Sequence, residues 1–299
     1  MNCNDKYEYV LATAARDEGQ YIRRCIESVI SQSVLPCKWV IVSNGSTDNT
    51  ENIVNEYAKD YQFIQLIKKE PNQKMKGFAN KVLALNAGIE LLKGLDYFLI
   101  GHIDADITVG KDYYEIMLNK FKNNSRLGIA GGYIFEEENG AYRCRSSNSP
   151  SSVAGGIQLF NRKCYQDIGG LKIMPMGGED WLGEIQARMH GWEVKAFPEV
   201  HVFHHKSGFL KRGMIREAIR GGTMDFTMGT HPLFEVFKCI RRIKKKPYFI
   251  FAIIRFYGFL RSYFIVQERH VTRKTMIFIR KDQLSRLRQN LFGFFRGLE

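Results

Sequence analysis

Two carboxylates one residue apart could hold a metal ion in this chain. Asp104 and Asp106 follow the apolar run 97–103 directly. A short apolar run with polar boundaries is typical of a buried strand in a parallel sheet. Two acids at the end of such a strand repel each other, and a divalent cation bound through oxygens, together with phosphates, would relieve that repulsion. Taken alone, the pair is more simply explained as a turn, because Asp favours turns.

Further candidates for chemistry lie about 75 and 100 residues downstream. Glu179 and Asp180 open an expected helix over 177–190, where the helix dipole stabilises acids and simple capping would explain them. His204 and His205 follow an expected strand over 193–197. They could add a nitrogen ligand or contact a diphosphate, and a structural role is the alternative.

The elements that must position these residues alternate between strand and helix. Apolar runs predict strands, and apolar residues at helical spacing predict helices. The expected order is strand 7–13, helix 19–32, strand 39–43, helix 50–59, strand 63–68, helix 77–93 and strand 97–103. This alternation predicts an α/β fold with right-handed crossovers and a mostly parallel sheet.

The alternation loosens after residue 106. We expect a helix over 112–122, strands over 127–135 and 153–160, and a short helix over 162–168. The polar stretch 136–152 is expected to be a loop.

Charge divides the chain into two parts. The net charge is +13, yet residues 201–299 hold 21 Lys and Arg against six Asp and Glu, and residues 1–200 hold 23 basic and 25 acidic residues. We therefore expect a catalytic domain over 1–205 and a basic, aromatic-rich helical extension over 206–299. Such asymmetry indicates an anionic partner, either a lipid surface or nucleic acid.

The most apolar stretch of the extension, 248–266, is interrupted by Arg255 and Arg261. A membrane span needs about 20 predominantly apolar residues, so we expect an amphipathic helix lying at a membrane interface. Packing of these aromatic residues on the catalytic domain is the alternative. The N-terminus carries no apolar signal-peptide core, and the six cysteines show no disulfide or zinc spacing.

The motifs stand in a distinctive order. Arg16-Asp-Glu-Gly follows the first strand, Ser43-Asn-Gly-Ser-Thr-Asp48 follows the second, and Asp104-Ala-Asp106, Gly178-Glu-Asp180 and His204-His205 come later. Over about residues 7–205 this set resembles the inverting family 2 glycosyltransferases, which have a Rossmann-like GT-A fold. The resemblance implies a glycosyltransferase that moves a hexosyl or N-acetylhexosaminyl group from a nucleotide-sugar donor to a glycan or lipid-linked acceptor.

The resemblance also implies roles for individual residues. Asp106, aided by Asp104, would hold Mg²⁺ or Mn²⁺ against the donor diphosphate, and Asp104 would contact the ribose or sugar. Asp180 would be the general base, with Glu179 and Trp181 shaping the acceptor site. The residues implied in donor binding are Thr13, Arg16, Glu18 and Asn44. Lys74 and Lys76, just before the third expected helix, are candidates for binding the diphosphate, and a solvated basic loop is the alternative.

One position departs from the family pattern. The family commonly has Asp-Asp-Gly-Ser where this chain has Ser43-Asn44-Gly45-Ser46. The amide oxygen of Asn44 could still accept a hydrogen bond from a nucleobase, but the bond would be weaker than one to a carboxylate. The identity of the base therefore stays open.

Other functions remain in competition. A nucleotidyltransferase would usually carry a Gly-rich phosphate loop after the first strand, where only Gly19 is present. A glycoside hydrolase needs two carboxylates but no metal site. A nucleic-acid-binding protein would suit the basic extension, although no such motif is found, and a non-catalytic sugar-nucleotide binder is the last alternative. We expect a cytoplasmic, polysaccharide-forming enzyme at the inner membrane face, with no nucleic-acid partner.

Overall fold

The computed structural model describes residues 8–75, 77–138, 140–206, 213–242 and 249–296. The chain divides into two compact units. The first comprises Met1–Pro175 and Glu179–Ser207, and the second comprises Met176–Gly178 and Gly208–Glu299. We call them the sheet unit and the helical unit.

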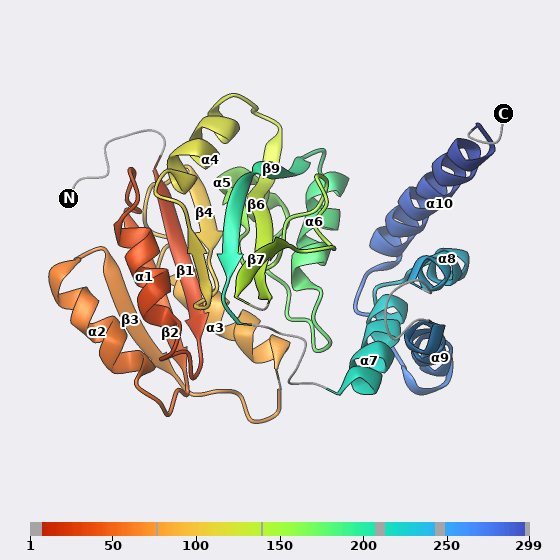
Figure 1. Cartoon of the computed structure of the whole chain (residues 1–299), viewed down its shortest axis with the longest axis horizontal. Helices are drawn as coiled ribbons and strands as arrows, with labels where there is room; N and C mark the ends of the chain where they lie inside the picture. Colours follow the sequence, from red (N-terminus) through yellow and green to blue (C-terminus); the bar gives the residue numbers. More distant parts are fainter. Residues whose placement is uncertain (1–7, 76, 139, 207–212, 243–248, 297–299) are drawn as a thin grey trace. The chain divides into compact units, whose positions relative to one another are not determined.

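A nine-stranded sheet forms the centre of the sheet unit, in the order β3-β2-β1-β4-β8-β6-β9-β5, with β7 paired to β6 (Figure 1). The strands β1, β2, β3 and β4 run parallel, whereas β5, β7 and β8 pair antiparallel to their neighbours. The bounds are β1 Tyr9–Ala15, β2 Lys38–Asn44, β3 Ile64–Lys69, β4 Leu99–His102, β5 Ile107–Val109, β6 Leu127–Glu138, β7 Ala141–Cys144, β8 Leu159–Asn161 and β9 Glu193–His204.

Helices cover both faces of this sheet. Alternate residues of β1 enter different cores: Tyr9 and Leu11 pack in one, and Val10 and Ala12 in the other. The first core includes α1 (Ile22–Ile30), α2 (Thr50–Asp60) and α4 (Tyr113–Lys122). The second includes α3 (Phe78–Glu90), α5 (Arg162–Asp167) and α6 (Glu179–Met189). Burial on both faces explains why the central strands are continuously apolar.

The structure corrects three sequence expectations. The stretch 136–152 contains the end of β6 and all of β7, which pair as a hairpin. Of the expected strand over 153–160 only the end is found, as β8, because residues 153–158 form an irregular segment instead. The last strand continues beyond residue 197 to His204, because β9 pairs with both β6 and β5.

The helical unit contains α7 (Met214–Thr227), α8 (Pro232–Arg242), α9 (Phe249–Ile265) and α10 (Arg273–Arg296). Arg255 of α9 is buried and forms ion pairs with Asp225 and Glu235, and its Nε lies 3.2 Å from Glu235 Oε1. One of the two arginines that interrupt the apolar stretch, Arg255, is therefore an internal ion-pairing residue of this unit. No helix among the described residues has the length and apolarity to cross a membrane.

Candidate active site

The carboxyl ends of β2, β1 and β4 lie side by side because these strands are neighbours in a parallel arrangement. Such an edge is where open α/β sheets bind ligands. Asn44 ends β2, Arg16 directly follows β1, and Asp104 lies two residues beyond the end of β4. The sheet thus gathers side chains that are up to 88 residues apart in the sequence.

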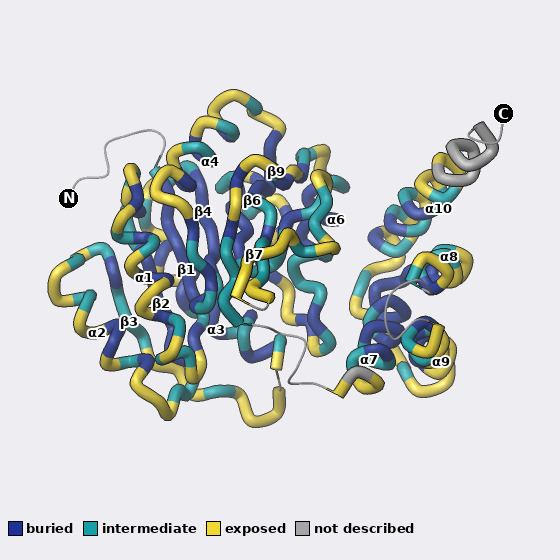
Figure 2. The backbone as a smooth tube through the Cα atoms, viewed as in Figure 1, coloured by how far each residue is buried: buried dark blue, intermediate teal, exposed yellow. Residues whose placement is uncertain are grey.

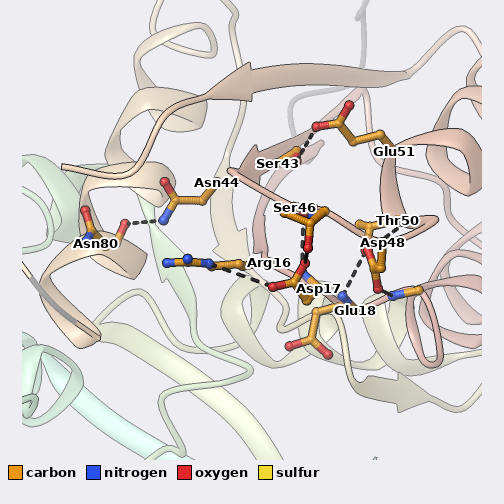
Figure 3. Close-up of polar contacts among 12 residues, drawn as sticks. Arg16, Asp17, Glu18, Ser43, Asn44, Ser46, Asp48, Thr50, Glu51 and Asn80 are labelled. Atoms are coloured by element: carbon orange, nitrogen blue, oxygen red, sulfur yellow. Dashed lines mark hydrogen bonds and ion pairs between the residues drawn. The ribbon is translucent and has the colours of Figure 1, made fainter. Parts of the chain in front are cut away.

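The turns after β1 and β2 are joined by hydrogen bonds (Figure 3). The backbone N–H of Thr47 donates to Asp17 Oδ1 at 2.8 Å, and that of Gly19 donates to Asp48 Oδ2 at 2.8 Å. Asp17 has a φ of +53°, a conformation uncommon for a residue other than glycine. These bonds hold Arg16 and Glu18 in place at the edge of the sheet.

The residues implied in donor binding differ in how accessible their side chains are. The Thr13 side chain is fully buried, and its hydroxyl donates to the Ile103 carbonyl at 2.7 Å and accepts from Trp39 Nε1 at 3.0 Å. Asn44 is also buried and donates from Nδ2 to the Asn80 carbonyl at 3.3 Å, which leaves its amide oxygen available. Arg16 and Lys74 are exposed, and Lys76 lies outside the described residues.

The carboxylate of Glu18 lies in this region, and only one of its two oxygens has a bonding partner. Lys206 Nζ lies 2.6 Å from its Oε1, whereas its Oε2 is buried without a hydrogen-bond partner. Burial raises the pKa of Glu18, Lys206 opposes the rise, and Asp106 and Asp104 add to it through space. Glu18 and the Asp104-Ala-Asp106 motif therefore belong to one electrostatic cluster.

Asp106 faces His204. The Nε2 atom of His204 is 3.4 Å from Asp106 Oδ2, and its Nδ1 is 3.6 Å from Glu136 Oε1. The pairing of β9 with β5 and β6 sets this contact, because His204 lies opposite both Ile107 and Glu136. Burial alone would raise the pKa of Asp106 and lower that of His204. The attraction between the two groups outweighs burial, so the pKa of Asp106 is lowered and that of His204 is raised.

His205 points elsewhere. Its Nε2 is 2.8 Å from Thr108 Oγ1, and its Nδ1 is 2.7 Å from the Tyr142 hydroxyl. Burial and Arg24 lower the pKa of His205, which favours the neutral ring. Both ring nitrogens are used in the sheet, so His204 is the histidine that faces the acidic motif.

Asp104 and Asp180 approach adjacent residues of the segment between β7 and β8. A Cβ atom on Gly155 would lie 2.4 Å from Asp180 Oδ2, and one on Gly156 would lie 3.0 Å from Asp104 Oδ2. The backbone N–H of Asp104 also donates to the Gly156 carbonyl at 2.8 Å. The two glycines therefore allow the acidic motif and the first turn of α6 to meet closely.

Glu179 lies within the same cluster. Its Oε2 is buried without a hydrogen-bond partner. Burial, followed by the charge of Asp180, raises the pKa of Glu179 to about 6, although Lys81 opposes the shift. Trp181 is partly buried beside it, and the backbone N–H of Trp181 donates to Asp180 Oδ1 at 2.7 Å.

A family model described as glycosyl transferase family 2 matches residues 11–176. The chain belongs to this family. Its sheet and helices form the GT-A fold that the motifs predict, as the comparison with solved structures shows.

Curated relatives align with 36–40% of this family 2 chain. Chondroitin synthase of Escherichia coli is 32% identical over 109 residues, covering 36% of this chain and 14% of the relative. Poly-beta-1,6-N-acetyl-D-glucosamine synthase of Staphylococcus epidermidis is 33% identical over 121 residues, covering 40% of this chain and 26% of the relative. The matched region is thus a minor part of each of these longer proteins.

Solved structures resemble more of the chain at lower identity. TarS 1–349 of S. aureus in complex with UDP-GlcNAc gives a TM-score of 0.54 at 11% identity, covering 91% of this chain and 78% of that one. The mannosyltransferase PcManGT from Pyrobaculum calidifontis, in complex with GDP-Man and Mn²⁺, gives 0.52 at 17% identity, covering 99% and 81%.

Three features of this family 2 site were missed by sequence reasoning. Lys81 contacts Asp104 with Nζ at 2.7 Å from Oδ1 and 2.8 Å from Oδ2. His102 is buried, its Nε2 lies 2.7 Å from the Gly155 carbonyl, and burial lowers its pKa. The third is Glu184, a buried carboxylate of α6 that accepts a hydrogen bond from the backbone N–H of Val153. A signal existed for Lys81, because it shares the i, i+4, i+7 face of α3 with the buried Leu85 and Gly88.

Proposed function

We propose that this chain is an inverting glycosyltransferase that moves a hexosyl or N-acetylhexosaminyl group from a nucleotide-diphosphate donor to a growing glycan or a lipid-linked acceptor. The observation that carries the proposal is the meeting of Asp104, Asp106, Asp180 and His204 around one edge of a GT-A sheet. The relatives named for chondroitin and poly-N-acetylglucosamine synthesis support a role in polysaccharide formation.

Asp106 and His204 would hold a divalent cation, Mg²⁺ or Mn²⁺. Among the described residues, no group of three or more His, Cys, Asp or Glu side chains is arranged to hold a metal. A carboxylate and an imidazole nitrogen 3.4 Å apart nevertheless fit a site completed by donor oxygens, because Mg²⁺ is commonly bound by one or two carboxylates plus substrate phosphates. Arg145 and Glu136 lie 3.3 and 3.6 Å from the other ring nitrogen and would orient the imidazole. The bound ion would neutralise charge on the diphosphate leaving group.

Asp180 is the proposed general base. The acceptor hydroxyl loses its proton to the Asp180 carboxylate as its oxygen attacks the anomeric carbon, and the bond from that carbon to the diphosphate breaks on the opposite side. One displacement of this kind inverts the anomeric configuration. Glu179 and Trp181, on the same helical turn, would contact the acceptor.

The donor's nucleoside would lie at the ends of β1 and β2. Asn44 offers its free amide oxygen to the base, and Arg16 and Glu18 lie on the adjoining turn. Thr13 would contribute through its backbone, since its hydroxyl is already bonded on both sides. The solved neighbours bind UDP, UDP-GlcNAc or GDP-Man, so uridine and guanosine donors are the first to test.

A combined binding and activity experiment tests the proposal. Thermal shifts are measured with UDP, GDP and dTDP, each with and without Mn²⁺, for the wild type and for Asp180→Asn. We expect one nucleotide to raise Tm in a metal-dependent way in both proteins, and Asp180→Asn to reduce transfer by at least about 100-fold. Equal loss of donor binding and turnover would exclude Asp180 as the base, and no metal-dependent shift with any nucleotide would remove the basis of the proposal.

The helical unit is proposed to hold the enzyme at an anionic membrane surface on the cytoplasmic side. Figure 2 colours much of α8 and α9 as exposed. The apolar residues Ile250, Ile253, Tyr257, Leu260 and Phe264 follow each other at helical spacing on α9 and are 45–90% exposed. Their side of the helix is opposite the side that buries Arg255. Combined with the basic composition of residues 201–299, this apolar stripe fits a helix lying in a lipid interface.

A further inference from the structure

Lys81 is the cation that neutralises Asp104. It lies in the first turn of α3, and its ammonium contacts both carboxylate oxygens, at 2.7 and 2.8 Å. About 29% of the Lys81 side chain and 26% of the Asp104 side chain are exposed, so the pair is largely shielded from water. Ion pairs in such surroundings are screened much less by salt than pairs at the surface.

The surroundings keep Lys81 charged. Burial disfavours the ammonium, but the charge of Asp104 and its hydrogen bond outweigh burial, and Glu179 and Asp106 act in the same direction. The pKa of Lys81 is consequently raised above its ordinary value.

The two acids of the motif therefore have partners of different kinds. Asp106 faces His204, and an imidazole nitrogen can itself bind a metal ion. Asp104 faces an ammonium, which offers three donors and no acceptor and so cannot ligate a cation. A divalent ion that approached Asp104 would have to displace Lys81 or accept its repulsion.

We propose that Lys81 is a built-in counter-cation that keeps Asp104 from ligating the divalent ion in the donor-free protein, leaving Asp106 and His204 as its ligands. The inference rests on the proposed metal site and refines it. Asp104 becomes a residue that positions Lys81 and remains available to a hydroxyl of the donor, and Asp106 becomes the acid on which metal affinity depends.

Mn²⁺ binding without donor, followed by the EPR signal of the free ion, tests the inference. Lys81→Met frees Asp104 and should tighten Mn²⁺ binding by about tenfold, because metal affinity in oxygen sites rises with the number of charged ligands. Asp104→Asn should change the affinity by less than about threefold, whereas Asp106→Asn should weaken it by more than about tenfold.

The double variant Lys81→Met with Asp104→Asn separates ligation from general electrostatics. If freed Asp104 is the cause, the tightening disappears when the carboxylate is absent. If the same tightening persists without Asp104, Lys81 acts only through long-range repulsion and the inference is overturned. Lys93→Met, which removes an exposed lysine paired with Glu90 beyond the end of α3, is the matched control and should leave Mn²⁺ affinity unchanged.

The results also distinguish this inference from the proposed function. Unchanged Mn²⁺ affinity in Lys81→Met, with the loss in Asp106→Asn intact, would overturn the role of Lys81 alone. Full Mn²⁺ binding by Asp106→Asn would overturn the metal site itself. Circular dichroism and Tm of each variant exclude unfolding as the cause.

Discussion

Glu184 is a buried carboxyl group that supports the segment facing Asp180, the proposed general base. It is 1% exposed and lies one helical turn after Asp180. Its Oε1 accepts from the backbone N–H of Val153 at 2.6 Å and from Ser152 Oγ at 3.2 Å. These bonds fix the start of the segment that carries Gly155 and Gly156.

The pH dependence of stability should reveal this buried group. Burial raises the pKa of Glu184 to about 7 from its ordinary value of 4.5. The folded state then binds the proton more tightly than the unfolded state, so the free energy of unfolding decreases as pH rises from about 4.5 to 7. Glu184→Gln should remove this decrease, which is on the order of 3 kcal/mol, as measured by denaturant unfolding at pH 5 and 8.

Glu199→Gln is the control with the opposite sign. Lys120, 2.8 Å away at the surface, lowers the pKa of Glu199, so its contribution is lost as pH falls. A parallel pH dependence in wild type and Glu184→Gln would show that Glu184 does not titrate in this range.

The segment between β7 and β8 is the element that decides how close the two acidic regions come. The sequence pattern predicts a strand there. The structure has a turn instead, which brings Gly155 against Asp180 and Gly156 against Asp104. Gly155 does not have a positive φ, so any residue could adopt its backbone conformation. A glycine is needed there because a side chain would collide with Asp180.

Gly155→Ala should impair catalysis with little effect on folding. The added methyl group would sit 2.4 Å from Asp180 Oδ2, so the carboxylate must move. We expect kcat to fall by about 100-fold or more because small misplacements of reacting groups are costly, and Mn²⁺ affinity to stay near the wild-type value. Gly94→Ala, where no atom lies within 4 Å of the added Cβ, is the matched control and should keep full activity. Equal kcat in Gly155→Ala and wild type would mean that Asp180 can relax without loss.

On the scale of the whole molecule, charge and exposed apolar area concentrate in the same third of the chain. The α9 stripe and the exposed apolar residues of α8, such as Leu233 and Ile240, belong to the unit whose sequence carries the positive charge. An interfacial helix gains affinity from both the apolar area it buries and the attraction to anionic lipids. We therefore expect binding to anionic lipid to depend on both the exposed apolar residues and the positive charge.

Vesicle flotation tests this expectation. The protein should bind vesicles containing phosphatidylserine or phosphatidylglycerol, and raising salt should weaken binding because the electrostatic part is screened. Ile253→Ser with Phe264→Ser should reduce the bound fraction at least about fivefold through the loss of apolar burial.

Ile215→Ser on α7 is the matched control, because Ile215 and Ile253 are both 62% exposed but Ile215 lies outside α8 and α9. Unaltered vesicle binding by the α9 double variant would contradict the lipid role. Concentration-dependent self-association abolished by the same substitutions would assign the stripe to a second copy of the chain.

Much of the fold of the sheet unit can be predicted from the sequence alone. Local apolar periodicity predicts the alternation through Ile103, because burial on both faces of a parallel sheet produces continuous apolar strands such as β2 and β4. The order of the motifs is enough to predict the family and the GT-A fold. The site residues Asp106 and Asp180 remain predictions, although the structure places both at the same edge of the sheet.

Only the tertiary structure decided which side chains contact these residues. That His204 rather than His205 faces Asp106 depends on the register of β9 against β5 and β6, since adjacent residues of a strand point to opposite faces. That Lys81 reaches Asp104 depends on how α3 packs on the sheet. The sequence determined the alternation of strands and helices through Ile103 and the positions of the acids, because those follow from local pattern. Contacts between residues far apart in the chain arise from strand register and helix packing, which no local pattern encodes.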